Sequence, residues 1–169
     1  QFPQARLALH AGELNLGIVP PEYLLSHIRS AVEVAGAERI GHGVDVSFER
    51  EPHQLLQSLK QKNVAIEINL TSNAFILGVK GADHPVTLYL QHGVPVVISS
   101  DDVGVSRNNL SNEYFQFTSR YKPSYDQLKK IVYNSIRYSF LKEDEKRKQL
   151  ALLDQKFVKF EAEVASFAR

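Results

Sequence analysis

A repeated unit constrains the fold of this chain more than any other feature: a short apolar run, a polar run, and then a segment of helical periodicity. The apolar runs, which are the expected strands, cover residues 6–10, 39–42, 64–70 and 94–99. Strands that alternate with helices form a parallel sheet with right-handed crossovers. The sequence therefore predicts an α/β fold whose strands lie parallel, adjacent and in sequence order.

Helical periodicity follows the expected strands and continues past the last of them. We expect helices over residues 20–35, 51–62, 84–92, 111–121 and 124–141. The final segment carries an apolar stripe with a 3-4-3-4-3 spacing, made of Leu150, Leu153, Phe157, Phe160, Val164 and Phe167. This stripe is typical of an amphipathic helix, and we expect it to pack against the core rather than to bind a partner.

The length limits how much of a larger architecture the chain can supply. Its 169 residues are interpreted as a single domain, residues 1–169. A complete (β/α)8 barrel needs about 250 residues, so the pattern predicts either half of such a barrel or a small open α/β sheet. Because the chain starts at Gln1 and contains no Met, we expect that a preceding segment is missing from this sequence.

Composition excludes several classes of function. The chain has no Cys, which excludes disulfides, thiolate zinc sites and a cysteine nucleophile. Its formal net charge of +1 predicts no attraction to nucleic acid or to an anionic membrane. No apolar run approaches the roughly 20 residues that span a bilayer.

Polar side chains follow each expected strand: His10 and Glu13, then His42, then Thr71, Ser72 and Asn73, and finally Ser99, Ser100, Asp101 and Asp102. The carboxyl ends of parallel strands form the active face of α/β folds. Imidazole and carboxylate groups together suit a divalent cation, most often zinc. The residues alone therefore predict a metal-assisted hydrolase.

Four short motifs resemble, in the same order, those of the adenosine deaminase family: HAGE at 10–13, RIGHG at 39–43, TSN at 71–73 and SSDD at 99–102. The run GVSRNNLSNEY at 104–114 is similar to the bacterial adenosine deaminase-like branch. The resemblance extends to about Leu141 and implies the C-terminal half of a (β/α)8 barrel with one catalytic Zn²⁺. It implies hydrolytic deamination of adenosine or deoxyadenosine to inosine and ammonia.

The resemblance also implies a role for each matched residue. His10 and Asp101 would bind zinc. Glu13 would protonate the purine ring nitrogen, and His42 would orient or deprotonate the water that zinc activates. Gly12 and Asp102 would contact the substrate, a small purine nucleoside.

The chain departs from the family pattern at three places. The family carries a His-x-His pair on its first barrel strand, whereas no two His residues of this chain are two positions apart. Leu70 stands where a Pro often precedes TSN, and Val103 stands where Pro is common after the Asp pair. With only two zinc ligands implied, we expect these 169 residues alone to be inactive, and to associate with their own N-terminal half or with another copy.

Two alternatives remain open at this stage. The substrate could be a nucleotide such as AMP or a modified adenine, and Arg107 is the candidate phosphate-binding residue. The chain could instead be a catalytically silent barrel fragment that acts as a binding module. His84, directly before Pro85, is expected to cap a helix or to pack a loop.

Overall fold

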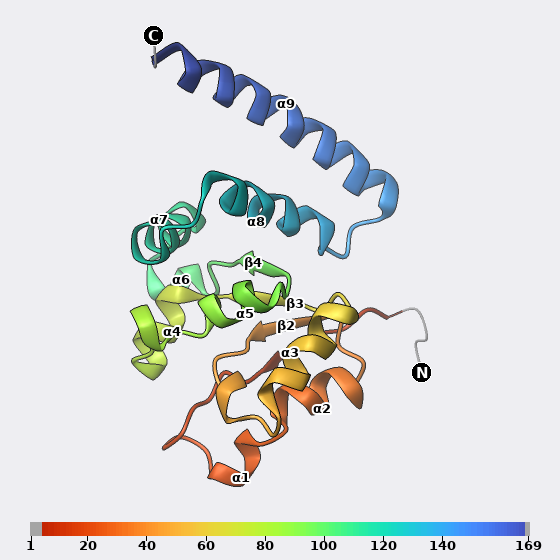
Figure 1. The fold of residues 1–169 in the computed structure, drawn as a ribbon, viewed down its shortest axis with the longest axis vertical. Helices are drawn as coiled ribbons and strands as arrows, with labels where there is room; N and C mark the ends of the chain where they lie inside the picture. The colour runs from red at the N-terminus through yellow and green to blue at the C-terminus, as the bar shows by residue number, and fades with distance from the viewer. Residues whose placement is uncertain (1–4, 168–169) are drawn as a thin grey trace.

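The computed structural model describes residues 5–167, so both ends of the predicted domain 1–169 lie outside the described residues. Its centre is a four-stranded parallel sheet with the order β1-β2-β3-β4 (Figure 1). The strands are β1 (Ala8–Ala11), β2 (Arg39–His42), β3 (Ala65–Ile68) and β4 (Val96–Ile98). The prediction of parallel, adjacent strands in sequence order is confirmed.

Helices connect the strands and extend beyond the last one. They are α1 (Pro21–Leu24), α2 (His27–Glu33), α3 (Pro52–Gln61), α4 (Leu70–Leu77), α5 (Val86–His92), α6 (Val103–Ser106), α7 (Leu110–Tyr121), α8 (Tyr125–Arg137) and α9 (Glu143–Phe167). Among the described residues, no helix combines the length and the apolar character needed to cross a membrane.

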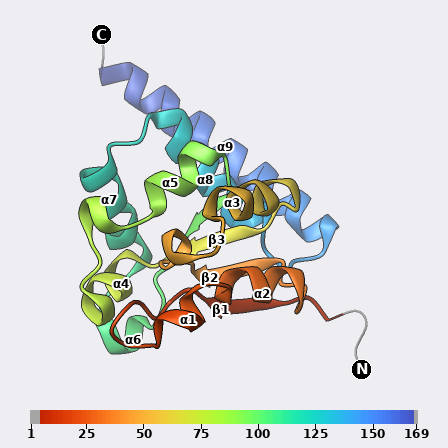
Figure 2. The same ribbon diagram turned by 60° about the horizontal axis from the view of Figure 1, so that its bottom comes forward.

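The core lies between the sheet and the helices of the crossovers. Figure 2 shows α2 and α3 covering one face of the sheet, and α5 also contributes to the same apolar core. The fully buried side chains of this core include Ile28, Ile40, Leu55, Ile66 and Tyr89. Their burial fixes the crossover helices on the sheet and thereby fixes where each strand ends.

The two outer strands have different surroundings. At β4, helix α8 packs alongside, and the Asn134 side-chain amide donates to the Val96 carbonyl at 3.0 Å. At β1, no further strand pairs with the outer edge within residues 5–167. In the described part of the chain, the outer edge of β1 therefore has no neighbouring strand.

The single helix expected over residues 20–35 is wrong, because the structure divides it into α1 and α2. The Glu49 carboxylate accepts from the main-chain N–H of Ile28 at 2.5 Å and of Arg29 at 3.2 Å, so it caps the start of α2. The Arg50 N–H donates to the Leu25 carbonyl at 2.8 Å and holds the break between the helices. A carboxylate from a later loop therefore decides where α2 begins.

The expectation for the terminal apolar stripe is only half right. Leu150, Leu153 and Phe157 are partly buried where α9 lies along α8, whereas Phe160 and Phe167 are 51% and 81% exposed. Figure 1 shows that α8 separates α9 from the sheet. The stripe therefore packs against one helix, with its second half outside the core.

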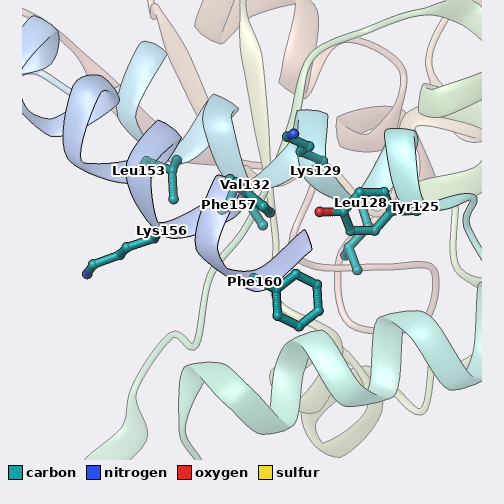
Figure 3. A pocket seen from close by; sticks show the side chains of 8 residues that line it. All are labelled: Tyr125, Leu128, Lys129, Val132, Leu153, Lys156, Phe157 and Phe160. Carbon is teal, nitrogen blue, oxygen red and sulfur yellow. The ribbon is translucent and has the colours of Figure 1, made fainter. Parts of the chain in front are cut away.

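A 360 Å³ pocket lies between α8 and α9 (Figure 3). Its lining is mainly apolar and comprises Tyr125, Leu128, Lys129, Val132, Leu153, Lys156, Phe157 and Phe160. None of these residues belongs to the polar runs at the strand ends, so the pocket is separate from the chemistry that the sequence predicts.

A buried carboxyl group follows β2. Asp45 is 0% exposed, and neither of its carboxylate oxygens has a hydrogen-bond partner among the described residues. Burial, together with the nearby Glu49 charge, raises the pKa of Asp45 from 3.8 to about 7. The folded state therefore binds more protons at this group than the unfolded state between these two pH values.

We predict that this group makes the protein less stable as the pH rises from about 4 to about 7, with a constant penalty above that. At about 1.4 kcal/mol per pKa unit, the total is about 4 kcal/mol at most. Asp45→Asn should flatten this dependence in urea unfolding measured across the range. Asp83→Asn, at an exposed carboxyl, should keep the parental dependence, and an unchanged slope in Asp45→Asn would contradict the prediction.

Candidate active site

Strand register aligns one row of residues across the sheet at its carboxyl end. His10 of β1 lies opposite Gly41 of β2, Gly41 lies opposite Glu67 of β3, and Glu67 lies opposite Val97 of β4. Side chains in one such row point to the same face of a sheet. The alternate residues Ile40 and Ile66 belong to the core under α2 and α3, so the row that contains His10 points to the opposite face of the sheet.

The His10 ring lies directly over Gly41. A Cβ atom at Gly41 would be 2.8 Å from His10 Cδ2 and 3.3 Å from His10 Nε2, so a side chain there would collide with the ring. The second Gly of the RIGHG motif, Gly43, faces Tyr89 instead, and a Cβ there would be 2.5 Å from the Tyr89 hydroxyl. The Tyr89 hydroxyl donates to the Gly43 carbonyl at 2.6 Å.

Two imidazoles and two carboxylates converge beside Gly41. His10 Nδ1 is 3.4 Å from Glu13 Oε2, and His42 Nε2 is 3.6 Å from Glu13 Oε1. Asp101 Oδ2 approaches the same His42 Nε2 at 3.8 Å. Residues from three different strand ends thus meet at His42: Glu13 lies between the two imidazoles, and Asp101 approaches His42 alone.

His42 is the buried member of this cluster. Its side chain is 0% exposed, whereas that of His10 is 65% exposed. Burial lowers the pKa of His42, and the opposing Glu13 and Asp101 charges do not cancel the effect. His42 and Asp101 both have left-handed backbone conformations, with φ of 72° and 51°, and such conformations often occur at functional sites.

The two residues predicted to contact the substrate, Asp102 and Gly12, differ in their exposure to solvent. Asp102 is exposed at the start of α6, where it lines a 90 Å³ cavity with Ser72 and Phe75 of α4. Gly12 is buried: its N–H donates to His27 Nδ1 at 3.3 Å, and its carbonyl accepts from the Asp45 N–H at 3.0 Å. A substrate-binding role for either residue stays a prediction.

Behind His42 lies a buried group of polar side chains, and the sequence alone did not predict their contacts with His42. The Asn73 side-chain nitrogen is 3.0 Å from His42 Nδ1, and that of Asn69 is 3.4 Å from the same atom. His84 Nε2 is 3.0 Å from Asn73 Oδ1. The predicted capping role of His84 is confirmed, because its Nδ1 accepts from the Val86 N–H at the start of α5.

The TSN segment is helical, although no helix was expected directly after the third strand. It lies in α4, whose first N–H groups, those of Leu70 and Thr71, donate to the Glu113 carboxylate at 2.8 and 3.2 Å. Glu113 is 0% exposed and comes from α7. A Pro in the place of Leu70 would have no N–H to donate, so this departure from the family pattern adds a capping hydrogen bond.

The residues present fit a divalent metal ion. Ligand atoms of His10, Glu13 and His42 all lie within 4.8 Å of one another. His42 Nε2 is buried without a hydrogen-bond partner among the described residues, although it faces two carboxylates. Imidazole and carboxylate donors together favour zinc over harder cations, which prefer oxygen ligands alone.

Comparison with known proteins assigns the chain to a family. The family model described as adenosine deaminase matches residues 3–156. The chain belongs to the adenosine deaminase family. Within it, an adenosine deaminase from Clostridium perfringens is 35% identical over 144 residues, which are 85% of this chain and 40% of that protein.

Solved structures of similar proteins agree on the fold. An adenine deaminase from Arthrobacter aurescens superposes with a TM-score of 0.73 at 28% identity, over 91% of this chain and 44% of that one. An amidohydrolase from Burkholderia ambifaria with bound Zn gives a TM-score of 0.79 at 18% identity, over 95% of this chain and 43% of that one. This member of the deaminase family therefore spans less than half the length of these relatives.

We predict that Gly41→Ala moves the His10 ring and weakens zinc binding by about tenfold or more, as displaced neighbours of metal ligands do. The measurement is a Zn²⁺ titration followed on the ring NMR signals of His10. Gly104→Ala is the matched control, because a Cβ there meets nothing within 4 Å. Equal zinc response in both variants would show that Gly41 does not position His10.

Proposed function

We propose that this chain supplies the C-terminal part of a barrel enzyme that hydrolyses the amino group of adenosine or deoxyadenosine, with zinc as its cofactor. The observation that carries the proposal is the convergence of Glu13, His42 and Asp101 with His10 at the strand ends, in a chain of the adenosine deaminase family. His10 and Asp101 would hold the ion. When bound, zinc supplies a Lewis acid that lowers the pKa of water to about 7.

The other residues have roles that follow from their positions. Glu13 reaches both imidazoles and keeps a side chain that is 26% exposed, so it can extend to a purine placed on the open face. Its carboxyl group would give a proton to the ring nitrogen while water adds to the carbon that carries the amine. His42 would orient or deprotonate this water, and the products are inosine and ammonia.

Charge at the site favours a nucleoside over a nucleotide. The groups facing His42 are the Glu13 and Asp101 carboxylates, and both would repel a phosphate. Arg107, the candidate phosphate-binding residue, is exposed at the end of α6 and is not among the groups that face His42. Rates with adenosine, adenine and AMP, measured side by side, test this substrate class, and a preference for AMP would overturn it.

We predict distinct effects for two substitutions when this chain is assayed as part of a complete barrel. Glu13→Gln should lower kcat by about 100- to 10,000-fold with zinc content unchanged, because it removes a proton donor. His10→Ala should lose the metal. Glu22→Gln, an exposed carboxyl in α1, should leave both unchanged, and normal turnover in Glu13→Gln would refute the assigned role.

The 169-residue chain alone is expected not to deaminate adenosine. Catalytic zinc generally has three protein ligands and one open position, and the family pattern assigns two ligands here, His10 and Asp101. Ammonia release and zinc content, measured together on the chain, check this expectation. Full activity of the chain alone would mean that its own residues complete the site.

A further inference from the structure

Val86, His84, Asn73 and His42 form a series of hydrogen bonds, and their donors and acceptors allow only one placement of the ring protons. The series begins at the main-chain N–H of Val86, which can only donate. It donates to His84 Nδ1 at 3.2 Å. His84 Nδ1 must therefore be the bare nitrogen of that ring, which leaves the ring proton of a neutral His84 on Nε2.

The next contact fixes the orientation of Asn73. His84 Nε2–H lies 3.0 Å from Asn73 Oδ1, which accepts the proton. The Asn73 amide nitrogen then points to His42 Nδ1 at 3.0 Å. An amide nitrogen donates and cannot accept, so His42 Nδ1 is the acceptor and carries no proton of its own.

Burial keeps this series intact. His42, Asn73 and His84 are each 1% exposed or less, so water does not compete for their polar atoms. Burial, together with the Arg120 charge, lowers the pKa of His84 to about 4. His84 accordingly stays neutral at physiological pH, and its Nδ1 stays available to Val86.

We propose that Val86, His84 and Asn73 form a relay that holds neutral His42 with its proton on Nε2, so that His42 presents a hydrogen-bond donor to the active site. Asn73 and His84 are thus positioning residues. The inference rests on the proposed function only for its catalytic meaning. It decides between the two roles left open for His42: a nitrogen that carries a proton orients an oxygen and does not deprotonate water.

His42 belongs to the group of three potential ligand residues described above, but in this tautomer it does not bind the ion, which leaves His10 and the carboxylates. A histidine binds metal through a bare nitrogen, and in this tautomer the nitrogen that faces Glu13 and Asp101 is protonated. The bare Nδ1 faces Asn73, away from the site. The imidazole that remains for the ion is His10, whose side chain is open to the active-site face.

The test measures the tautomer directly by long-range ¹H–¹⁵N correlation of the histidine rings in ¹⁵N-labelled protein, assigned with a His42→Gln variant. In the parental protein, His42 should show a protonated Nε2 and a bare Nδ1. A proton on His42 Nδ1 would overturn the relay. Because this measurement needs no turnover, the relay can fail while the deaminase proposal stands, and the reverse.

Asn73→Asp is the decisive variant, because it replaces the amide donor with a carboxylate of the same shape. The carboxylate should still accept from His84, but it now requires a donor from His42, so Nδ1 should gain a proton. Asn63→Asp makes the same exchange at an exposed position and should leave the His42 signals unchanged. A bare Nδ1 in Asn73→Asp would contradict the proposal.

A second pair of variants covers the case in which Asn73→Asp does not fold, as judged by circular dichroism. His84→Gln keeps an amide nitrogen that can donate to Asn73 and should preserve the parental tautomer. His84→Leu removes the donor, frees Asn73 to turn over, and should give His42 a mixture of both tautomers. Identical His42 signals in these two variants would overturn the relay.

Discussion

The parallel alignment of four strands is the constraint on which the rest of this structure depends. It brings His10, His42 and Asp101 to one edge from points far apart in the sequence. The alignment also requires a residue without a side chain beside His10, because Gly41 is its register partner. Shifting β2 by one position would place a bulkier neighbour there and turn its side chains to the opposite face.

Buried carboxylates set the helix boundaries around this edge. Glu49 caps α2 from 21 residues away in the sequence, and Glu113 caps α4 from 43 residues away. A carboxylate satisfies the free N–H groups of a first helical turn and complements the positive end of the helix dipole. The capped α4 carries Asn73, so Glu113 indirectly determines where the partner of His42 lies.

The sequence allowed the sheet and much of the candidate site to be predicted, for physical reasons. A short β-branched run such as residues 94–99 favours a buried strand over a helix, and polar residues directly after parallel strands gather at the carboxyl edge. The break between α1 and α2 and the helix at TSN were missed because their caps come from distant segments. The roles of Asn73 and His84 were missed because a tautomer depends on contacts in three dimensions.

Helix α9 has a consequence for how the protein responds to proteases. It packs mainly on α8, through contacts such as the stacked rings of Tyr133 and Phe157, 5.4 Å apart. Its later turns carry the exposed side chains of Phe160 and Val164 and bury little surface. Fraying of these turns leaves the sheet undisturbed, so trypsin should cleave first at Lys159, while the strands that hold His10 and His42 stay folded.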